Sequence, residues 1–301
     1  MRGKSLFLLF LFLAVASLLV VLVFQPGHDD KWAARTKQID EMKSKAKANT
    51  LPHSMFQGEP TPGNAWDEYD IARKVLKSYV DVYLREEIRE EQIVRQLDPF
   101  ARFLEAAAQS SGTIVNLARI GREAGTDAKA VSRYFQILED TLIGFFLDPY
   151  HRSVRKRQRQ QAKFFLFDIG VRRALEGTLH QTPRPGTYEW GRSFEELVVL
   201  EAIRLNSYLR CGFRFSYLRT QSQMEVDLIA ERRGSATWVV EIKSGTDPDP
   251  TDLRKLRVLA ADIPDARPAI FCAAEHPKIV DDVEVLPWRT GLERMFMEPE
   301  R

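Results

Sequence analysis

Two stretches of the chain, 225–231 and 238–243, are rich in β-branched and aliphatic residues and carry charged residues at alternate positions. A short polar segment around Gly234 separates them. This pattern predicts two β-strands joined as a hairpin. Side chains alternate between the two faces of a strand, so a turn centred on Gly234 also predicts which residues share a face.

The predicted register gathers charge on one face of the hairpin. Asp227 faces Glu241, and Glu225 faces Lys243 on the neighbouring strand. Nearer to the turn this face continues with Ile229 and Val239, and the opposite, core face consists of Val226, Leu228, Ala230, Trp238, Val240 and Ile242.

Two carboxylates that face each other on paired strands repel and destabilise the pair. A divalent cation would offset this repulsion, since Mg²⁺ takes oxygen ligands and commonly uses one or two carboxylates. Lys243 would offset it as well, because it follows Glu241 on the same face at a distance of roughly 7 Å. The alternative without a function is a solvated face with an ion pair, which adds little to stability.

The rest of the second half predicts a mixed sheet with helices. The segment 191–205 reads as a largely buried helix that carries Glu195. Further strands and a helix extend the hairpin into an α/β unit with a mixed sheet. These elements are expected near 213–219 (strand), 250–261 (helix), 268–274 (strand) and 283–288 (strand).

The middle of the chain predicts a helix-turn-helix. A short helix ends at Gly125, and Thr126 or Asp127 caps a second helix. The strand-like segments 142–147 and 164–168 would form the wing of a winged helix. The outer face of the second helix, where a recognition helix meets a major groove, consists of Lys129, Ser132, Arg133 and Gln136.

A basic run between the two wing strands supports a nucleic-acid partner. Such a run can neutralise phosphates, whereas the alternative interpretation is a solvated loop. A winged helix can also bind only protein, so a partner protein stays open as well. The basic residues of this run are Arg152, Arg155, Lys156, Arg157, Arg159 and Lys163.

The segment 5–24 contains no charged residue and, as a helix, would be roughly 30 Å long, which matches a bilayer core. It predicts a single membrane anchor, with a cleaved secretory signal as the alternative. More basic residues follow the segment closely than precede it, which favours a cytoplasmic body. Residues 25–65 are polar and read as a tether.

Composition narrows the classes of protein only modestly. The chain has 301 residues and a formal net charge of +2, so any nucleic-acid surface must be local. The two cysteines, Cys211 and Cys272, indicate no disulfide framework and fit a reducing compartment. The five histidines never pair with a cysteine at zinc spacing.

Five motifs occur in a characteristic order: YVDVYLREEI, FFLDPYHRSVRKR, KFFLFDIGVRRAL, GRSFEELVVLEAI and EVDLIAERRG…EIKSG. From about residue 75 to about 292, this series resembles the C-terminal region of a prokaryotic family of AAA-type ATPases. In that family a P-loop domain precedes a winged helix and a domain similar to PD-(D/E)xK nucleases. No G-x-x-x-x-G-K-[ST] motif is present in this sequence, so no nucleotide is expected.

The resemblance implies roles for four residues. Asp227 and Glu241 would hold Mg²⁺, Lys243 would orient or deprotonate the attacking water, and Glu195 would complete the metal shell. Together with the patterns of the N-terminal segments, it predicts four parts: an anchor (1–24), a tether (25–65), a helical and winged-helix domain (66–185) and a nuclease-like domain (186–296).

Two functions follow as hypotheses. The first is a binding module that holds DNA or a partner protein, in which the nuclease-like domain is a non-catalytic scaffold or regulator. The second is a Mg²⁺-dependent nuclease, which would need a basic cleft over Glu241. Candidates for the lining of that cleft are Arg254, Lys255 and Arg257.

Overall fold

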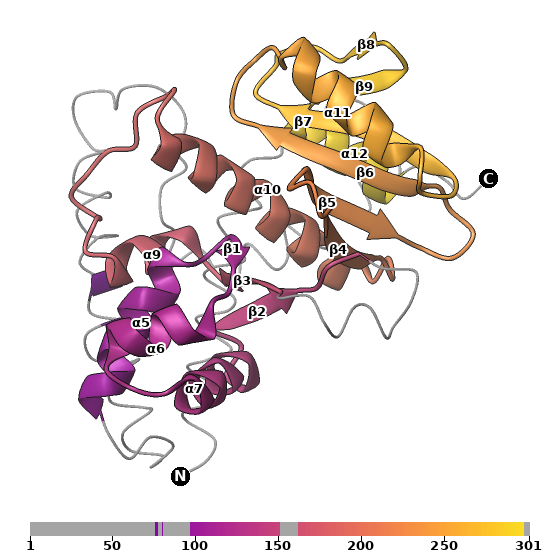
Figure 1. Ribbon diagram of the computed structural model, residues 1–301. Helices are drawn as coiled ribbons and strands as arrows, with labels where there is room; N and C mark the ends of the chain where they lie inside the picture. The colour runs from indigo at the N-terminus through magenta and orange to yellow at the C-terminus, as the bar shows by residue number, and fades with distance from the viewer. Residues whose placement is uncertain (1–75, 78–79, 81–96, 151–161, 298–301) are drawn as a thin grey trace. The chain divides into compact units, whose positions relative to one another are not determined.

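The computed structural model describes residues 76–77, 80, 97–150 and 162–297. The helices and strands named below lie in one compact unit that spans Arg85–Arg301 (Figure 1). Among the described residues, no helix is long and apolar enough to cross a bilayer. The predicted anchor at 5–24 and the tether at 25–65 lie outside the described residues.

The first group of elements is a helical domain with a small antiparallel sheet in the strand order β1-β3-β2. A helix-turn-helix followed by two paired strands is the predicted arrangement, and the structure confirms it. The elements are α5 (Leu97–Gln109), β1 (Thr113–Ile114), α6 (Leu117–Ala124), α7 (Ala128–Asp140), β2 (Gly144–Leu147) and β3 (Lys163–Leu166).

Local sequence signals determine the ends of these helices. Gly125 ends α6 in the left-handed conformation (φ 70°), which glycine adopts without steric cost. Asp127 caps α7, since its side chain accepts a backbone hydrogen bond of 2.7 Å in the first turn. An aromatic core joins the helices to the sheet: the Phe135 ring lies 4.9 Å from Phe103 and 4.7 Å from Phe164.

Two helices connect this domain to the larger sheet. Asp168 caps α9 (Ile169–Leu175), because its carboxylate accepts a hydrogen bond of 3.0 Å from the backbone N–H of Val171. The long α10 (Tyr188–Leu209) then follows, capped by the Thr187 hydroxyl. Its length and its buried face position Glu195 against the sheet.

The larger sheet has six strands in the order β4-β5-β6-β7-β9-β8. Parallel pairs join β6, β7 and β9, and the other pairs are antiparallel, which confirms the predicted mixed sheet. The sequence patterns did not predict β8 or the final helix. The elements are β4 (Arg214–Arg219), β5 (Glu225–Glu231), β6 (Thr237–Lys243), α11 (Pro250–Ala260), β7 (Ala266–Cys272), β8 (Lys278–Val280), β9 (Val283–Pro287) and α12 (Trp288–Met297).

Helices cover both faces of the larger sheet (Figure 1). On one face Leu256 of α11 packs in a core cluster with Ile270 of β7. On the other face α12 lies so close to β7 that a Cβ atom at Gly291 would be 2.4 Å from the ring of Phe271. Because neighbouring strand residues point to opposite faces, Ile270 and Phe271 assign α11 and α12 to opposite faces.

Candidate carboxylate–lysine site and outer face of α7

The β5–β6 hairpin has the predicted register. The backbone pairing between the two strands stops before Asp227. There the Asp227 carboxylate accepts a hydrogen bond of 2.8 Å from the backbone N–H of Ile242. The side chain of Asp227 is thereby held against β6, close to Glu241. The paired residues of the ladder are Leu228↔Val240, Ile229↔Val239 and Ala230↔Trp238.

The prediction that all four charged residues share one face is wrong. The pairing of β4 with β5 shifts by one residue between Ser216 and Leu218, which is a β-bulge beside Asp227. Val226, predicted on the opposite face, therefore lies with Ile229 in the cluster beneath α11.

The bulge turns Glu225 away from α11. Because Val226 points toward α11, the adjacent Glu225 points to the opposite side, toward α10. Glu241 stays on the α11 side, where its carboxylate contacts Lys255. The bulge thus divides the predicted face, and Asp227 lies between the two halves.

Four acidic side chains, Glu195, Glu225, Asp227 and Glu241, form what we call the carboxylate cluster. Burial, reinforced by the negative charge of Asp227, raises the pKa of Glu195 to about 8 and the pKa of Glu241 to about 7. Burial also raises the pKa of Asp227, against the opposing effects of Lys163 and the hydrogen bond from Ile242. The cluster brings together Glu195, Asp227 and Glu241, which the sequence singled out from distant positions.

Lysines neutralise the half of the cluster beneath α11. The Lys243 ammonium lies 3.0 Å from Glu241 Oε1 and 3.1 Å from Asp252 Oδ1, and Lys255 lies 3.1 Å from the same Glu241 oxygen. Burial acts to lower the pKa of Lys243, but the two carboxylates outweigh it and raise this pKa. Glu241 is only 3% exposed, so the alternative of a solvated ion pair does not describe it.

The carboxylate oxygens of Glu241 and Asp227 are of the chemical type that binds a hard divalent cation. Glu241 Oε2 is buried and has no hydrogen-bond partner in the described structure, and the Asp227 carboxylate lies nearby. Carboxylate oxygens of this kind are the ligands that Mg²⁺ uses. Within the described ranges, however, no three His, Cys, Asp or Glu side chains are arranged as a group that could hold a metal ion.

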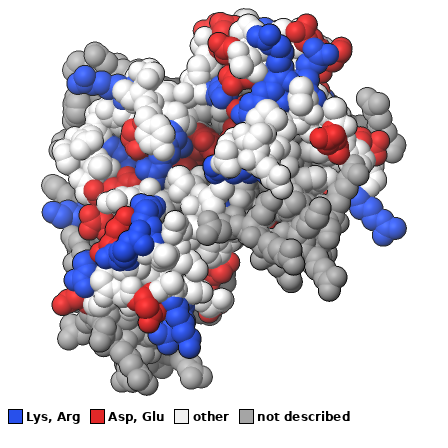
Figure 2. All heavy atoms as spheres, in the orientation of Figure 1, with Lys and Arg blue, Asp and Glu red and all other residues white. Residues whose placement is uncertain are grey.

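The second candidate surface is the outer face of α7. Lys129, Ser132, Arg133 and Gln136 are all exposed there, as predicted. On the side seen in Figure 2, acidic and basic side chains are interspersed over the described surface, with basic ones gathered near α11. Of the predicted wing contacts, Arg155, Lys156 and Arg157 lie outside the described residues.

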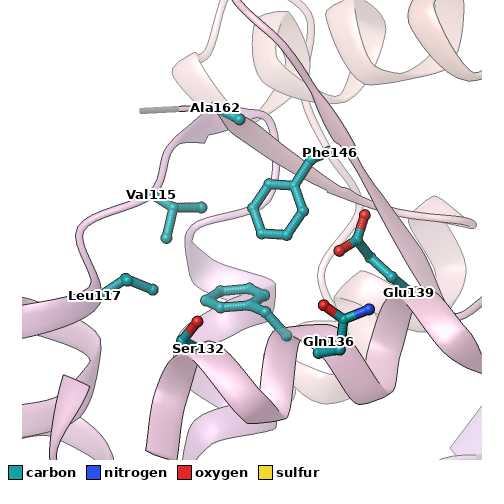
Figure 3. Close-up of a pocket in the computed structure, with 8 residues that line it drawn as sticks. Val115, Leu117, Ser132, Gln136, Glu139, Phe146 and Ala162 are labelled. Carbon is teal, nitrogen blue, oxygen red and sulfur yellow. The ribbon is translucent and has the colours of Figure 1, made fainter. Parts of the chain in front are cut away.

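A hollow of about 240 Å³ lies beside this face of α7. Figure 3 shows Gln136 and Glu139 together on one side of it, with Val115 and Leu117 on the other. The pKa of Glu139 is raised by burial and by the charges of Asp140 and Asp148. The residues that line the hollow are Val115, Leu117, Ser132, Phe135, Gln136, Glu139, Phe146 and Ala162.

Two family models match the chain. Residues 60–182 match a domain of unknown function, DUF8612, and residues 190–290 match another, DUF4143. The uncharacterized proteins Mb2031c of Mycobacterium bovis and Rv2008c of Mycobacterium tuberculosis are each 28% identical to the chain over 183 residues. This alignment covers 59% of the chain and 39% of each relative, so the chain spans about two fifths of their length. No solved structure matches the chain significantly.

The region that matches DUF8612 contributes a residue whose role the sequence did not reveal. Lys163 was assigned to the basic run that would contact phosphates, but it is 3% exposed and forms ion pairs with Glu195 and Glu225. The assignment to a phosphate-binding run is therefore wrong for this residue. Its sequence neighbours offered no signal, since a lysine that begins a strand has the same pattern whether it is buried or exposed.

A buried arginine network is the second feature that the sequence did not reveal. Arg172 of α9 is fully buried and lies 2.7 Å from Glu196, 2.6 Å from Glu189 and 3.1 Å from Glu176. Successive residues of a helix point in different directions, so Glu196 meets Arg172 while the adjacent Glu195 meets Lys163. One glutamate of this pair is structural, and the other belongs to the carboxylate cluster.

Proposed function

We propose that the chain is a binding module that contacts DNA through the outer face of α7, while the larger sheet is a non-catalytic scaffold. The observation that carries this proposal is the exposure of Lys129 and Arg133 on the second helix of a helix-turn-helix. A helix in that position fits the major groove, where arginine reads guanine and lysine contacts phosphate. The basic residues of 151–161 would add phosphate contacts.

The carboxylate cluster supports a scaffold function for the larger sheet. Repulsion among acidic side chains suggested a need for a metal ion, but Lys163, Lys243 and Lys255 already supply positive charge there. The cluster can therefore be stable without a metal. This charge balance supports a structural role for the carboxylate cluster, as part of the packing of the larger sheet.

The test measures the salt dependence of DNA affinity. The full chain in a mild detergent is titrated against a labelled duplex at several salt concentrations, followed by fluorescence anisotropy. We expect Lys129→Ala combined with Arg133→Ala to weaken binding and to make the slope of log K against log salt shallower by about one, because Lys129 contacts phosphate and Arg133 contacts a base. Arg233→Ala, which removes an exposed arginine in the turn between β5 and β6, is the control and should keep the wild-type slope.

Two results would contradict the proposal: a double variant with the wild-type slope, or a wild-type chain that binds no duplex. In either case a partner protein becomes the better candidate for this face. The hollow beside α7 favours that alternative, because the apolar part of its lining, which includes Val115, Leu117 and Phe146, would accept an apolar side chain of a partner.

A second candidate function is Mg²⁺-dependent cleavage of phosphodiester bonds. The proximity of Asp227, Glu241 and Lys243 favours it, together with the unpartnered Oε2 atom of Glu241. Asp227 and Glu241 would hold the ion, which supplies stabilisation of negative charge on phosphate oxygens. Lys243 would orient the attacking water, and Glu195 would support the shell.

The nuclease hypothesis predicts Mg²⁺-dependent cleavage of single- or double-stranded DNA or RNA by the wild-type chain. Asp227→Asn should abolish that cleavage, whereas Glu231→Gln, at the opposite end of the same strand, should not. If purified wild-type chain leaves all these nucleic acids intact at millimolar Mg²⁺ or Mn²⁺, the scaffold proposal stands alone.

We further propose that the chain acts as the C-terminal part of an AAA-type ATPase does, without hydrolysing nucleotide. The ordered motifs and the match to DUF4143 support this relationship. We also propose that residues 5–24 anchor the protein in a membrane, with the body in the cytoplasm. Fractionation of cells that express the full chain, with and without these residues, would test the anchor.

A further inference from the structure

The hollow beside α7 has one apolar side and one polar side (Figure 3). Leu117 of α6 lies on the apolar side, Gln136 and Glu139 of α7 lie on the polar side, and the ring of Phe146 lies between them. Leu117 and Phe146 are only half-buried, so water reaches this apolar surface. Its volume of about 240 Å³ is below the about 300–1,000 Å³ of pockets for small-molecule ligands, so the hollow suits a single long side chain.

The carboxylate of Glu139 lines this hollow without a cation beside it. Burial is the largest cause that raises the pKa of Glu139, and the negative charges of Asp140 and Asp148 raise it further. Among the residues that the structure describes, no lysine, arginine or histidine forms an ion pair with this carboxylate. The polar side of the hollow is therefore negative, and a positively charged group would neutralise it.

The other polar atoms at the hollow can accept hydrogen bonds. Gln136 donates its amide N–H to Asp140 at 3.0 Å, which leaves its amide oxygen to accept. Ser132, one turn earlier on α7, adds a hydroxyl to the lining. Together with the carboxylate of Glu139, these atoms favour a cationic group that donates several hydrogen bonds.

An arginine side chain combines the properties that this hollow accommodates. Its stem is apolar and would pack against Leu117, while its charged end stays beside the polar side. The guanidinium is always charged and carries five N–H donors in one plane. It is also attracted to the faces of aromatic rings, which Phe135 and Phe146 supply here. A lysine ammonium is a compact charge without this flat surface, so arginine fits better.

A strained and exposed leucine lies next to the hollow. Leu142 follows α7, and its backbone N–H donates to the carbonyl of Glu139 at 3.0 Å. Its φ of 60° is in the left-handed region, which leucine rarely adopts, and the residue is 57% exposed. An exposed apolar residue at this place would contact apolar neighbours of an arginine that enters the hollow.

We propose that this hollow binds an arginine side chain that a partner protein presents beside apolar residues. The guanidinium pairs with Glu139 and donates to Gln136, while its stem packs in the apolar part of the hollow. Lys129 and Arg133, the proposed DNA contacts, lie in the first half of α7, whereas Glu139 lies near its end. The acidic end of the helix repels phosphate and attracts a cation, so the arginine site is separate from the DNA contacts.

The test is a peptide titration that contains no DNA. The probe is a labelled pentapeptide with one arginine between two leucines and an alanine at each end, and its binding to the full chain in a mild detergent is followed by fluorescence anisotropy. A second peptide has citrulline in place of arginine, which keeps the shape of the side chain and removes its charge. Glu139→Gln removes the carboxylate of the hollow, and Glu105→Gln, at an exposed glutamate of α5, is the matched control.

We expect the wild type and Glu105→Gln to bind the arginine peptide about tenfold more tightly than the citrulline peptide, since only the arginine forms charge-assisted hydrogen bonds. Glu139→Gln should bind both peptides with the same weak affinity, because it lacks the carboxylate that distinguishes them. Its unfolding temperature should stay close to that of the wild type, which separates a lost contact from a lost fold.

Equal affinity of the wild type for the two peptides, or no binding at millimolar peptide, would overturn the proposal. A preference for arginine that persists in Glu139→Gln would place the peptide elsewhere and contradict the assignment.

Two other occupants of the hollow would also make the assignment to a partner protein wrong. Self-association of the wild type that Glu139→Gln abolishes would identify a second copy of the chain. Tighter peptide binding after replacement of Arg155, Lys156 and Arg157 by glutamine would identify the basic run of this chain. None of these results bears on DNA binding by α7, so the two proposals fail separately.

Discussion

The buried carboxyl of Glu241 makes a prediction about how stability varies with pH. Glu241 is 3% exposed, and burial is the largest cause that raises its pKa, followed by the negative charge of Asp227. Lys243 and Lys255 oppose this effect, and the resulting pKa is about 7. We consider the substitution Glu241→Gln, which keeps the shape of the side chain and removes its titration.

The direction of this pH dependence follows from the linkage between protonation of Glu241 and folding. The pKa of Glu241 in the folded chain is higher than its ordinary value of 4.5, so the folded state favours the protonated carboxyl. Its contribution to stability is greatest below pH 4.5 and falls as the pH rises through about 7. One unit of pKa corresponds to about 1.4 kcal/mol, so the loss over this interval is about 3 kcal/mol.

Urea unfolding of the full chain, in a mild detergent with EDTA, measures this loss. Trp238 and Trp288 are buried and report on the larger sheet by fluorescence. Between pH 5 and pH 8 the wild type should lose about 2–3 kcal/mol more than Glu241→Gln does. Glu231→Gln, at the exposed pair with Arg214, is the control and should follow the wild type.

An identical change in stability for the wild type and Glu241→Gln would refute this reasoning. It would mean that the two lysines outweigh burial and keep Glu241 charged throughout the interval. A variant that is less stable at both pH values, by a constant amount, would also count against it, because a constant loss reflects broken ion pairs and not titration.

Two substitutions elsewhere test the packing. Arg172→Met should lower the free energy of unfolding by about 3 kcal/mol in thermal or urea unfolding, because it leaves the buried Glu196 without its arginine. A loss within experimental error would contradict a stabilising role for this ion pair. Gly291→Ala should cost about 1–3 kcal/mol, since its Cβ would meet the Phe271 ring, whereas Gly245→Ala, with no atom nearer than 4.0 Å, should be close to neutral.

Local patterns predicted much of the architecture. The hairpin register, the end of α6 at Gly125 and a cap of α7 at Thr126 or Asp127 all follow from signals within a few residues of one another, and the structure selects Asp127. Side chains alternate between the two faces of a strand, and helix ends need residues that satisfy unpaired backbone groups. Both requirements involve only neighbouring residues, so a short segment of sequence is enough to predict them. The final strand was predicted one residue too long, because Trp288 begins α12.

The missed elements lacked such signals. The strand β8 spans only Lys278–Val280 and lies at the edge of the sheet, where it is too short to show a period of two. Among the candidate site residues, Glu195, Asp227, Glu241 and Lys243 do come together, although the sequence could not tell how the bulge would orient them.

The amino-acid sequence was sufficient for the kinds of element, for their order, and for the choice of carboxylates that lie near one another. It was not sufficient for the position of Lys163, which reads as one more residue of a basic run and is instead enclosed by Glu195, Glu225 and Tyr217. A periodic pattern reports on neighbours along the chain. Burial of a charge depends on which distant side chains surround it, and the packing of the two matched regions determines that.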